Sequence, residues 1–384
     1  MRISQATLSL PLTLQRGINI KTSKMAAIPE THRAYRRTPG TGTAENPVSI
    51  EQTTEPTIPS GGKLGPHDVM IRIRAVSLNY RDIAMLNGRY TMNTLDSGIV
   101  ASDCAAEVAA LGSSVTDFKV GDRVSPIFAL EYRTGNEDLE VDEFSMLGGD
   151  CDGVLREYAV FEDKVLVHLP KHLTWEEAST IACAGCTAWN ALNAPSSLGQ
   201  NKTALLQGTG GVSMFALLIA LAGDIKPIIS SSSDQKLEAI KKLAPEGTIL
   251  GYNYKANPDQ SAAVRAMLGG KGVDIIVNNT GPPNIPADIA TLRRNGRISL
   301  VGFLEGVLAD WNPAQLMALI GKSGSITGIA FGAKTHFEAL NRFIEEKNVR
   351  LEPLVDRVFG FDEAKAAFEH LNSGKHVGKV VIKF

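Results

Sequence analysis

The sequence predicts an α/β protein with two structural units, a β-rich unit and a doubly wound parallel sheet that follows it. Three observations lead to this class. The chain has 384 residues, and at roughly 150 residues per domain this length suits two cores. Apolar and charged residues alternate in residues 68–76, as in a half-buried strand. After Trp189, β-prone runs alternate with helical ones, which is the pattern of βαβ units and a parallel sheet.

The first 25 residues are treated apart from the fold. Residues 1–29 contain no Asp or Glu and are rich in Ser, Thr and Leu, and their basic residues are Arg2, Arg16, Lys21 and Lys24. This composition suits a mitochondrial transit peptide. In the alternative interpretation translation begins at Met25, and the segment before it is a disordered tail or an error of the gene model.

The β-rich unit is predicted to occupy residues 26–185. The alternating strand of residues 68–76 is its clearest element, and residues 117–124 form a turn that leads into another strand. The stretch 131–152 is acidic, contains glycine and has no periodicity. We therefore expect it to be a long surface loop.

The parallel sheet is predicted to occupy residues 186–329. Residues 212–221 form a helix with an apolar surface all round, and residues 233–243 an amphipathic helix that Ser and Asp open. The predicted strands are residues 204–207, 227–230, 273–277 and 297–301, with a helix at residues 285–292 before the last of them. The chain then ends in two helices and a strand, which would return residues 330–384 to the first unit: residues 334–347, 362–371 and 379–383.

Composition argues against two classes of function. The 39 Lys and Arg residues nearly balance the 41 Asp and Glu residues, so the chain lacks the positive excess of nucleic-acid or polybasic membrane binders. The longest apolar run, residues 214–222, is far short of the roughly 20 residues that span a bilayer. Four cysteines do not make a disulfide framework in a chain this long. We expect a cytoplasmic protein, or a mitochondrial one if residues 1–24 are a transit peptide, with no nucleic-acid or membrane partner.

The strongest chemical signal is a glycine-rich run between the first predicted strand of the sheet and the helix that follows it. Gly208 permits a tight turn, and Gly210 lets the backbone approach a pyrophosphate, whose charge then faces the free N–H groups of the helix start. Ser213 replaces the third glycine of the dinucleotide fingerprint. A plain glycine turn is the alternative, and the flanking βαβ units argue against it. The predicted dinucleotide-binding residues are Gly208, Thr209, Gly210, Gly211, Val212 and Ser213.

The end of the second strand favours NADPH over NADH as the cofactor. An NAD site places a carboxylate there, which binds the ribose 2′-OH. This chain instead has four serines, residues 230–233, with Lys236 after them. Hydroxyls and a lysine suit a 2′-phosphate, so Ser231, Ser232 and Lys236 are candidate ligands of that group. Two alternatives stay open: Asp234 takes the carboxylate role if the strand ends later, or the serines form only a loop and a helix cap.

The cysteines do not indicate a metal site. Cys183 and Cys186 form a CxxC pair, but Cys104 and Cys151 stand alone, and no histidine lies at ligand spacing near them. A redox pair is an alternative, and small apolar thiols packed in a helix are the simpler interpretation. Without a metal or an evident nucleophile, hydride transfer from a nicotinamide becomes the expected chemistry.

The order of these features resembles the medium-chain dehydrogenase/reductase superfamily. More specifically, it is similar to the zinc-independent branch called zinc-type alcohol dehydrogenase-like, near the quinone oxidoreductases. The resemblance runs from about Val69 to the C-terminus, over more than 300 residues, and implies a GroES-like catalytic domain and a Rossmann nucleotide domain. It rests on residues 78–82, 87–90, 118–124, 183–189, 207–213, 296–302 and 378–381.

The departures from the family argue against catalytic zinc. In the zinc enzymes a cysteine stands at the position of Asn79, and a His-Glu pair at that of Ser102 and Asp103. Of the zinc-ligand positions, Cys183 alone keeps a ligand, and one thiolate does not hold a catalytic zinc. The lobe with four cysteines that binds structural zinc is also absent, and the stretch 131–152 takes its place.

The resemblance implies a catalytic wall of Asn79, Asp82 and Tyr90. Tyr90 ends an Asn-x-Gly-x-Tyr run similar to that of zinc-free enoyl reductases, in which a tyrosine donates the proton. The alternatives are that Asn79 and Asp82 only brace a helix, that Tyr90 is a buried rim aromatic, and that Arg81 or Tyr80 faces the nicotinamide instead. The remaining implied cofactor contacts are Asn278, Asn279, Gly281, Gly302 and Phe303 toward the nicotinamide and Lys379 near the phosphates.

These observations lead to an NADPH-dependent reductase of α,β-unsaturated carbonyl compounds (enones) or quinones that works without a metal. The alternatives are a zinc-free alcohol dehydrogenase or carbonyl reductase, a non-catalytic NADPH-binding protein, and a biosynthetic enzyme with one narrow substrate. Many members of the superfamily are dimers or tetramers joined through the nucleotide-domain sheet, and residues 298–303 would lie near such an edge. We therefore also expect a homodimer.

Overall fold

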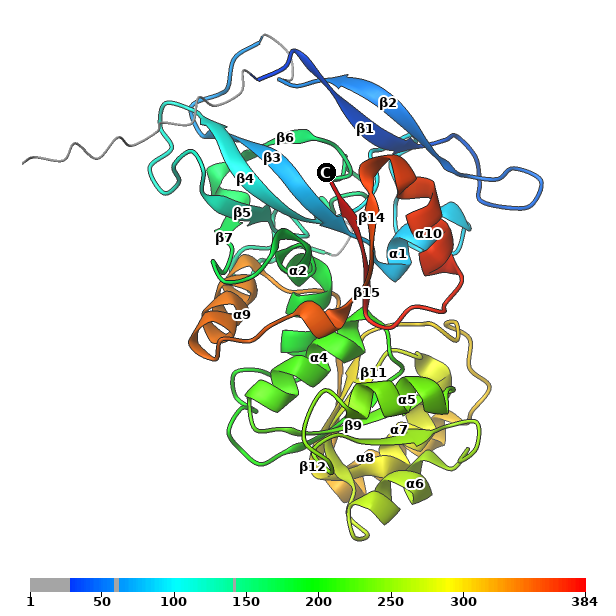
Figure 1. Ribbon diagram of the computed structural model, residues 1–384. Coiled ribbons are helices and arrows are strands. Elements are labelled where there is room, and N and C mark those ends of the chain that lie inside the picture. Colours follow the sequence, from blue (N-terminus) through cyan, green and yellow to red (C-terminus); the bar gives the residue numbers. More distant parts are fainter. Residues whose placement is uncertain (1–27, 59–61, 141–142) are drawn as a thin grey trace, which may run out of the picture.

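Two β-sheets organise the protein, one above the other in the view of Figure 1. The computed structural model describes residues 28–58, 62–140 and 143–384, so the transit-peptide hypothesis concerns residues outside the described part. A two-stranded hairpin of β1 (Thr31–Arg37) and β2 (Ile50–Pro56) lies beside the upper sheet. No helix among the described residues is both long and apolar enough to cross a membrane.

The upper sheet has seven strands in the order β14-β15-β3-β4-β5-β7, and β6 pairs with β3 off this path. In β3, Ile71 and Ile73 are buried while Arg72 between them is exposed, as the alternating pattern predicts. The last strand pairs antiparallel with β3, so the end of the chain is built into this sheet. The strands are β3 (Asp68–Ser77), β4 (Asp103–Leu111), β5 (Arg123–Pro126), β6 (Tyr158–Glu162), β7 (Leu166–His168), β14 (Val355–Gly360) and β15 (Lys379–Lys383).

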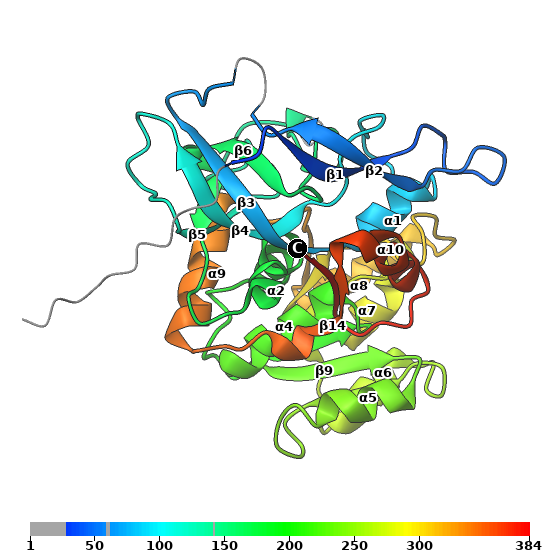
Figure 2. The same ribbon diagram turned by 45° about the horizontal axis from the view of Figure 1, so that its top comes forward.

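Short helices cover this sheet and lead to the lower one. Helices α1 and α10 contact each other and lie side by side near β15 in Figures 1 and 2. The helices are α1 (Tyr80–Leu86), α2 (Trp175–Ala178), the π-helix η3 (Ile181–Gly185), α3 (Cys186–Ala191), α9 (Lys334–Glu346) and α10 (Ala364–Asn372). Single 3₁₀ turns are η2 (Asp163–Val165), η6 (Glu352–Leu354) and η7 (Phe361–Glu363).

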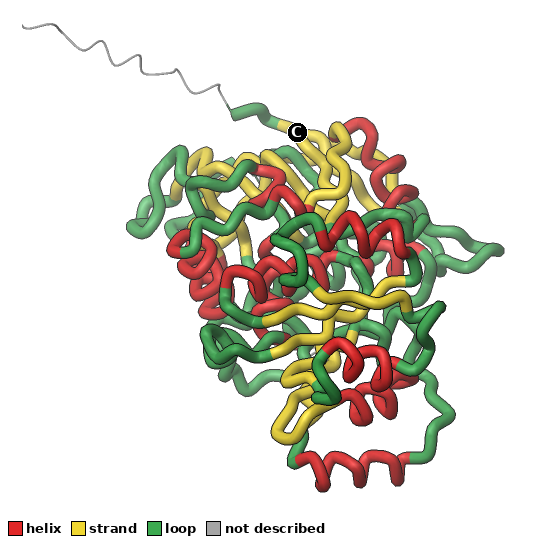
Figure 3. Tube along the Cα trace, turned by 60° about the horizontal axis from the view of Figure 1, so that its bottom comes forward, coloured by secondary structure: helices red, strands yellow, loops and turns green. Residues whose placement is uncertain are grey.

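The lower sheet has six parallel strands in the order β10-β9-β8-β11-β12-β13. The strand order reverses between β8 and β11, which is the switch point where doubly wound sheets bind ligands. Figure 3 brings this part of the molecule forward and shows helices on both sides of its strands. The strands are β8 (Thr203–Gln207), β9 (Lys226–Ser231), β10 (Leu250–Asn253), β11 (Val273–Asn278), β12 (Leu292–Leu300) and β13 (Ser325–Gly328).

The helices of the lower unit correct the sequence analysis in places. The two predicted strands at residues 273–277 and 297–301 and the helix between them are present, but β12 begins at Leu292. Strands β10 and β13 and helix α6 were not predicted. The helices are α4 (Gly211–Ala222), α5 (Asp234–Lys241), α6 (Gln260–Met267), α7 (Ile285–Thr291) and α8 (Ala318–Lys322), with 3₁₀ turns η4 (Pro282–Asn284) and η5 (Pro313–Met317).

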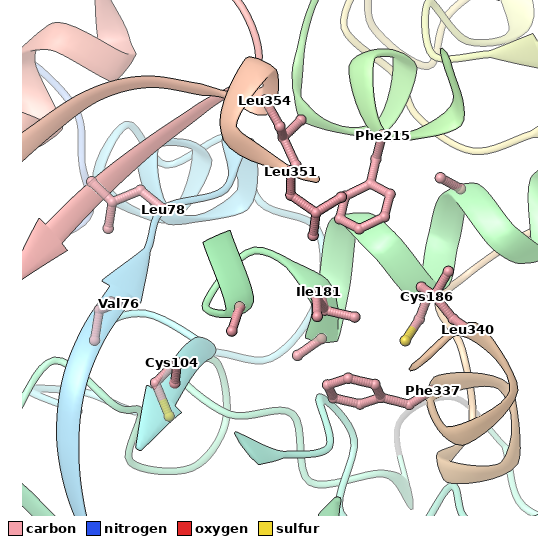
Figure 4. Packing of buried hydrophobic residues seen from close by; sticks show 14 of the residues in the cluster. Val76, Leu78, Cys104, Ile181, Cys186, Phe215, Phe337, Leu340, Leu351 and Leu354 are labelled. Carbon is pink, nitrogen blue, oxygen red and sulfur yellow. The ribbon is translucent and has the colours of Figure 1, made fainter. Parts of the chain in front are cut away.

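Helix α4 explains why its sequence is apolar all round: it packs between the lower sheet and the helices above it. Phe215 of α4 points toward Leu351 in Figure 4, and Leu340 of α9 lies on the other side of α3 and η3. A Cβ atom at Gly185 would lie 2.9 Å from the Phe215 ring and 3.1 Å from Leu340. The missing side chain therefore allows this close packing. The domain limits after residues 185 and 329 stay predictions.

Candidate functional site

The glycine loop begins where β8 ends and carries the geometry of an anion site. Gly208 has φ +79°, a conformation that favours glycine. A Cβ atom at Gly208 or Gly210 would meet nothing within 4 Å, so this part of the loop borders open space. Gly210 caps α4 without any side-chain hydrogen bond, and the first N–H groups of the 12-residue helix are free to face a negative charge. These residues fit the pyrophosphate of a dinucleotide.

The remaining loop residues hold the turn in place. Ser213 is buried, and its Oγ donates to the carbonyl of Gln207 at 2.7 Å. The hydroxyl thus closes the turn at the position of the fingerprint's third glycine. The carbonyl of Thr209 accepts from the N–H of Gly378 at 2.8 Å, which joins the loop to the segment before β15. Val212 is half-buried and packs on the core.

At the end of β9 the structure presents hydroxyl groups. Ser231 is the last residue of the strand and is buried, and its Oγ accepts from the N–H of Ser233 at 3.2 Å. Ser233 caps α5, and Ser232 between them is exposed. Ser230 Oγ accepts from the N–H of Gly208 at 3.3 Å. The serine run and the glycine loop therefore lie side by side, and the run also supplies a helix cap.

The charged residues after the serines point in different directions. Asp234 accepts a hydrogen bond from Asn253 Nδ2 at 3.1 Å and lies in the first turn of α5. It does not follow the end of β9 directly, because the strand ends at Ser231. The Lys236 ammonium donates to the carbonyls of His376 at 2.8 Å and Gly374 at 3.3 Å, in the segment between α10 and β15.

A ring of polar groups, buried except for the half-buried Asn79, lies where the resemblance places the catalytic-zinc ligands. Lys379 Nζ lies 2.5 Å from Asn79 Oδ1 and 3.8 Å from Asp103 Oδ2. Asn79 Nδ2 donates to Ser102 Oγ at 3.4 Å, which donates to Asp103 Oδ1 at 2.7 Å. The contact between Asp103 and Lys379 closes this ring, and the N–H of Cys183 also donates to Asp103 Oδ2, at 3.1 Å. An amide, a hydroxyl and an ammonium do not fit a zinc ion, and the described residues include no cluster of three metal-ligating side chains.

The same lysine touches the glycine loop. A Cβ atom at Gly211 would lie 2.6 Å from Lys379 Cδ, so the lysine stem rests against the first turn of α4. Lys379 is 2% exposed. The resemblance implies a place for Lys379 near the phosphates and for Asn79 in the catalytic wall, and the structure brings the two side chains together.

Asp82 braces the start of α1. Its Oδ2 accepts from the N–H of Asn79 at 2.7 Å, while Oδ1 is buried without a partner among the described residues. Burial raises the pKa of Asp82. These contacts match the bracing role that the sequence analysis weighed against a catalytic one.

Tyr90 is held by Arg81, a residue that the sequence analysis named only as an alternative. Arg81 Nε donates to the phenol oxygen of Tyr90 at 3.3 Å, and Nη1 donates to the carbonyl of Leu147 at 2.7 Å. The guanidinium carbon lies 5.2 Å from the centre of the Tyr90 ring and 4.8 Å from that of Phe128. A buried arginine between two aromatic rings thus orients the phenol.

An aromatic cluster lies next to these groups. Phe128, Phe144 and Phe331 pack with Tyr132 and Cys183. Burial raises the pKa of Cys183 to about 12, so its thiol stays protonated at neutral pH and is a poor nucleophile. A cavity of about 510 Å³ borders the cluster and is lined in part by the loop of residues 131–152.

The predicted nicotinamide contacts follow the ends of β11 and β12. Asn279 Nδ2 donates to Ser213 Oγ at 2.9 Å and to the carbonyl of Gln207 at 3.2 Å. A Cβ atom at Gly302 would lie 2.8 Å from the carbonyl oxygen of Asn279. The Phe303 ring lies 6.2 Å from the ring of Tyr80 on α1. Asn279 therefore borders the glycine loop and Gly302 packs against Asn279, while Phe303 contacts the first helix of the upper unit.

Comparisons with known proteins give a consistent assignment. The alcohol dehydrogenase GroES-like domain family matches residues 65–171, and the zinc-binding dehydrogenase family matches residues 211–346. The zinc-type alcohol dehydrogenase-like protein C1773.06c of Schizosaccharomyces pombe is 37% identical over 327 residues, which are 84% of this chain and 92% of the relative.

Two further likenesses bear on fold and chemistry. A crystal structure from Sinorhizobium meliloti 1021, assigned as an alcohol dehydrogenase, has a TM-score of 0.79 and 34% identity and covers 91% of this chain and 99% of its own. Crotonyl-CoA reductase of Streptomyces collinus is 25% identical over 361 residues, which are 83% of this chain and 78% of the relative.

Proposed function

The chain belongs to the medium-chain dehydrogenase/reductase superfamily of NAD(P)-dependent oxidoreductases, and we propose that it uses NADPH to reduce an α,β-unsaturated carbonyl compound or a quinone without a metal ion. The observation that carries this proposal is the polar ring around Lys379, in which an ammonium, an amide and a hydroxyl leave the Asp103 carboxylate as the single zinc-binding group.

NADPH would supply the hydride. The residues of this chain bind the cofactor, orient the proton donor and protonate the substrate. The glycine loop and the start of α4 hold the pyrophosphate, with Lys379 beside them. Hydride addition to the β-carbon of an enone moves the π electrons of the double bond toward the carbonyl, so that negative charge develops on its oxygen. The Tyr90 phenol, oriented by Arg81, donates a proton to this oxygen, and the enol that forms tautomerises to the saturated carbonyl compound.

The preference for NADPH rests on the end of β9. A 2′-phosphate beside Ser231 and Ser232 would meet hydroxyl groups and the Lys236 ammonium. Asp234 lies in the first turn of α5, where it accepts from Asn253, and Ser231 stands at the end of β9 in place of a carboxylate.

A second candidate is a zinc-free alcohol dehydrogenase or carbonyl reductase. The family matched by residues 65–171 and the 34–37% identical relatives carry alcohol dehydrogenase names. The crotonyl-CoA reductase relative instead favours reduction of a carbon–carbon double bond next to a carbonyl.

Rates of NADPH oxidation with three acceptors distinguish these functions. We expect turnover with 2-cyclohexenone or a benzoquinone and little with cyclohexanone, because conjugate addition spreads the developing charge. Faster turnover of cyclohexanone would favour the carbonyl reductase. Tight NADPH binding without turnover of any acceptor would favour a non-catalytic role.

The proposed oligomer is a homodimer joined along β13. This strand ends the six-strand order and has β12 on one side. The chain between β12 and β13 exposes large apolar side chains: Leu308 is 88% exposed, Ile320 70% and Met317 63%. A second copy of the chain would cover both the open strand edge and these side chains.

A further inference from the structure

Asp288 is a fully buried carboxylate in the nucleotide unit that the proposed mechanism does not use. It lies on α7 with 0% exposure. Its Oδ1 accepts from Gln207 Nε2 at 2.7 Å, Gln260 Nε2 at 2.8 Å and Asn284 Nδ2 at 2.9 Å. Its Oδ2 accepts from Asn278 Nδ2 at 2.6 Å. Four neutral amides therefore surround the carboxylate, and we refer to these four side chains as the amide cage.

Two members of the amide cage are the last residues of the strands at the switch point. Gln207 ends β8 and leads into the glycine loop, and Asn278 ends β11. The carbonyl of Gln207 also accepts from Ser213 and Asn279, which border the proposed dinucleotide site. The cage thus joins the two strand ends that form the floor of that site.

The orientation of these two amides is fixed by a second contact. Gln207 Oε1 accepts from Thr280 Oγ1 at 3.0 Å, and Asn278 Oδ1 accepts from the N–H of Gly281 at 2.7 Å. Each amide therefore has its oxygen engaged and turns its NH₂ group to Asp288. A carboxylate accepts all four donors, whereas a protonated carboxyl group needs an acceptor. Protonation would require one amide of the cage to turn its oxygen to Asp288, and when Gln207 or Asn278 turns, Thr280 or Gly281 is released.

Among the described residues, no cation pairs with Asp288. Arg265 of α6 and Lys322 of α8 donate to backbone carbonyls, and Arg293 of β12 pairs with Asp274 of β11. Tyr252 of β10 is the titratable group that faces the cage, and its hydroxyl donates to Gln260 Oε1 at 3.3 Å. Burial without a cation raises the pKa of Asp288 to about 7 despite the four donors.

We propose that Asp288 is a positioning residue whose carboxylate holds the ends of β8 and β11 in the shape that binds the dinucleotide, so that its protonation weakens cofactor binding. The inference rests on the proposed cofactor site. Because the pKa lies near 7, the ionised form prevails above pH 7 and the protonated form below it. The affinity for the dinucleotide is therefore high at pH 8 and falls as the pH drops below 7.

The test measures the dissociation constants of NADPH and NADH from nicotinamide fluorescence between pH 5.5 and 8.5, without any substrate. NADH is included because the 2′-phosphate of NADPH titrates itself, with a pKa near 6. For the wild-type protein we expect both constants to rise about tenfold from pH 8 to pH 6, as follows if the protonated form binds poorly. A pH-independent constant for NADH would overturn the proposal.

Two variants identify Asp288 as the group responsible. Asp288→Asn places an NH₂ group among four donors, so we expect weaker binding at pH 8 and no inflection near pH 7. Asp274→Asn is the matched control, because Asp274 lies near the opposite end of β11 and should leave the inflection in place. An inflection retained in Asp288→Asn would overturn the proposal.

A third variant tests the mechanism if Asp288→Asn does not fold. Thr280→Val removes the hydroxyl that fixes Gln207, so that the amide can turn its oxygen to a protonated Asp288. We expect the inflection to move to higher pH, and an unmoved inflection would contradict the role of the cage. Failure to bind either cofactor at any pH would refute the proposed function, whereas pH-independent binding would refute only this inference.

Discussion

Lys379 and Arg81 are two buried positive charges of the candidate site, and each is held by a different kind of neighbour. Lys379 lies against an amide and a carboxylate, and its stem packs on Gly211 of α4. Arg81 lies between two aromatic rings and donates to Tyr90. The lysine thus links the phosphate end of the site to the catalytic wall, and the arginine holds the proposed proton donor.

These contacts explain why the sequence predicts some residues of the site and not the contacts between others. The glycine loop was identified because its residues are contiguous and lie between a strand and a helix. Asn79 and Lys379 are 300 positions apart, and no local pattern reports such a contact. Arg81 was weighed only as a residue near the nicotinamide, because its partner Tyr90 lies beyond the end of α1 and the second aromatic ring, Phe128, comes from another segment.

Removal of the Tyr90 hydroxyl tests the proposed proton donor. We expect Tyr90→Phe to lower kcat for an enone by about a hundredfold, since general acid catalysis contributes about 10²–10⁴, while the dissociation constant of NADPH stays unchanged. Steady-state kinetics and fluorescence titration measure the two quantities. Tyr158→Phe, on β6 of the upper sheet, is the control. Full activity of Tyr90→Phe would assign the proton donor to another residue.

At the scale of elements, the pattern of apolar residues predicts the buried helix α4 but does not predict the short strands. Helix α4 was expected to be apolar all round, and it packs between the lower sheet and the helices above it. Strands β10 and β13 have four residues each, too few for a periodic signal. The β13 edge, which the dimer proposal needs, was therefore not recognised as a strand. The antiparallel pairing of β15 with β3 joins segments about 300 residues apart.

Lys236, near the start of α5, is the residue at which the preference for NADPH over NADH is tested. Lys236→Met should raise the dissociation constant of NADPH by about tenfold, which corresponds to about 1.4 kcal/mol for a lost charged hydrogen bond. That of NADH should stay the same. Fluorescence titration with both cofactors measures the effect, and Lys241→Met, at the far end of the same helix, is the matched control. An equal loss for both cofactors would show that Lys236 acts on the fold and not on the 2′-phosphate.

At the scale of the whole molecule, the lower sheet provides the proposed cofactor site and the upper unit provides the proposed catalytic residues. The lower sheet places the glycine loop and the ends of β11 and β12 at one edge. The upper unit supplies Asn79, Tyr90 and the aromatic cluster. The two units also contact each other directly, through the hydrogen bond from Gly378 to Thr209 and the aromatic pair of Tyr80 and Phe303.

The proposed dimer also belongs to this scale. Light scattering of the purified protein should give twice the chain mass of 41.1 kDa. Leu308→Asp should convert it to a monomer without loss of thermal stability of the fold, because Leu308 is 88% exposed in the single chain. Leu243→Asp, at a 40% exposed position after α5, is the control. A wild-type monomer, or a Leu308→Asp dimer, would contradict the proposed interface.

The central claim is hydride transfer to a carbon–carbon double bond by residues that need no metal, and isotope tracing tests it most directly. The protein is incubated with NADPH deuterated on its transferable hydrogen and with 2-cyclohexenone, with and without a zinc chelator, and the product is identified by mass spectrometry and NMR. The account predicts cyclohexanone with deuterium on the former β-carbon, in equal yield with the chelator. Cyclohexenol with deuterium on the carbinol carbon, or activity abolished by the chelator, would contradict it.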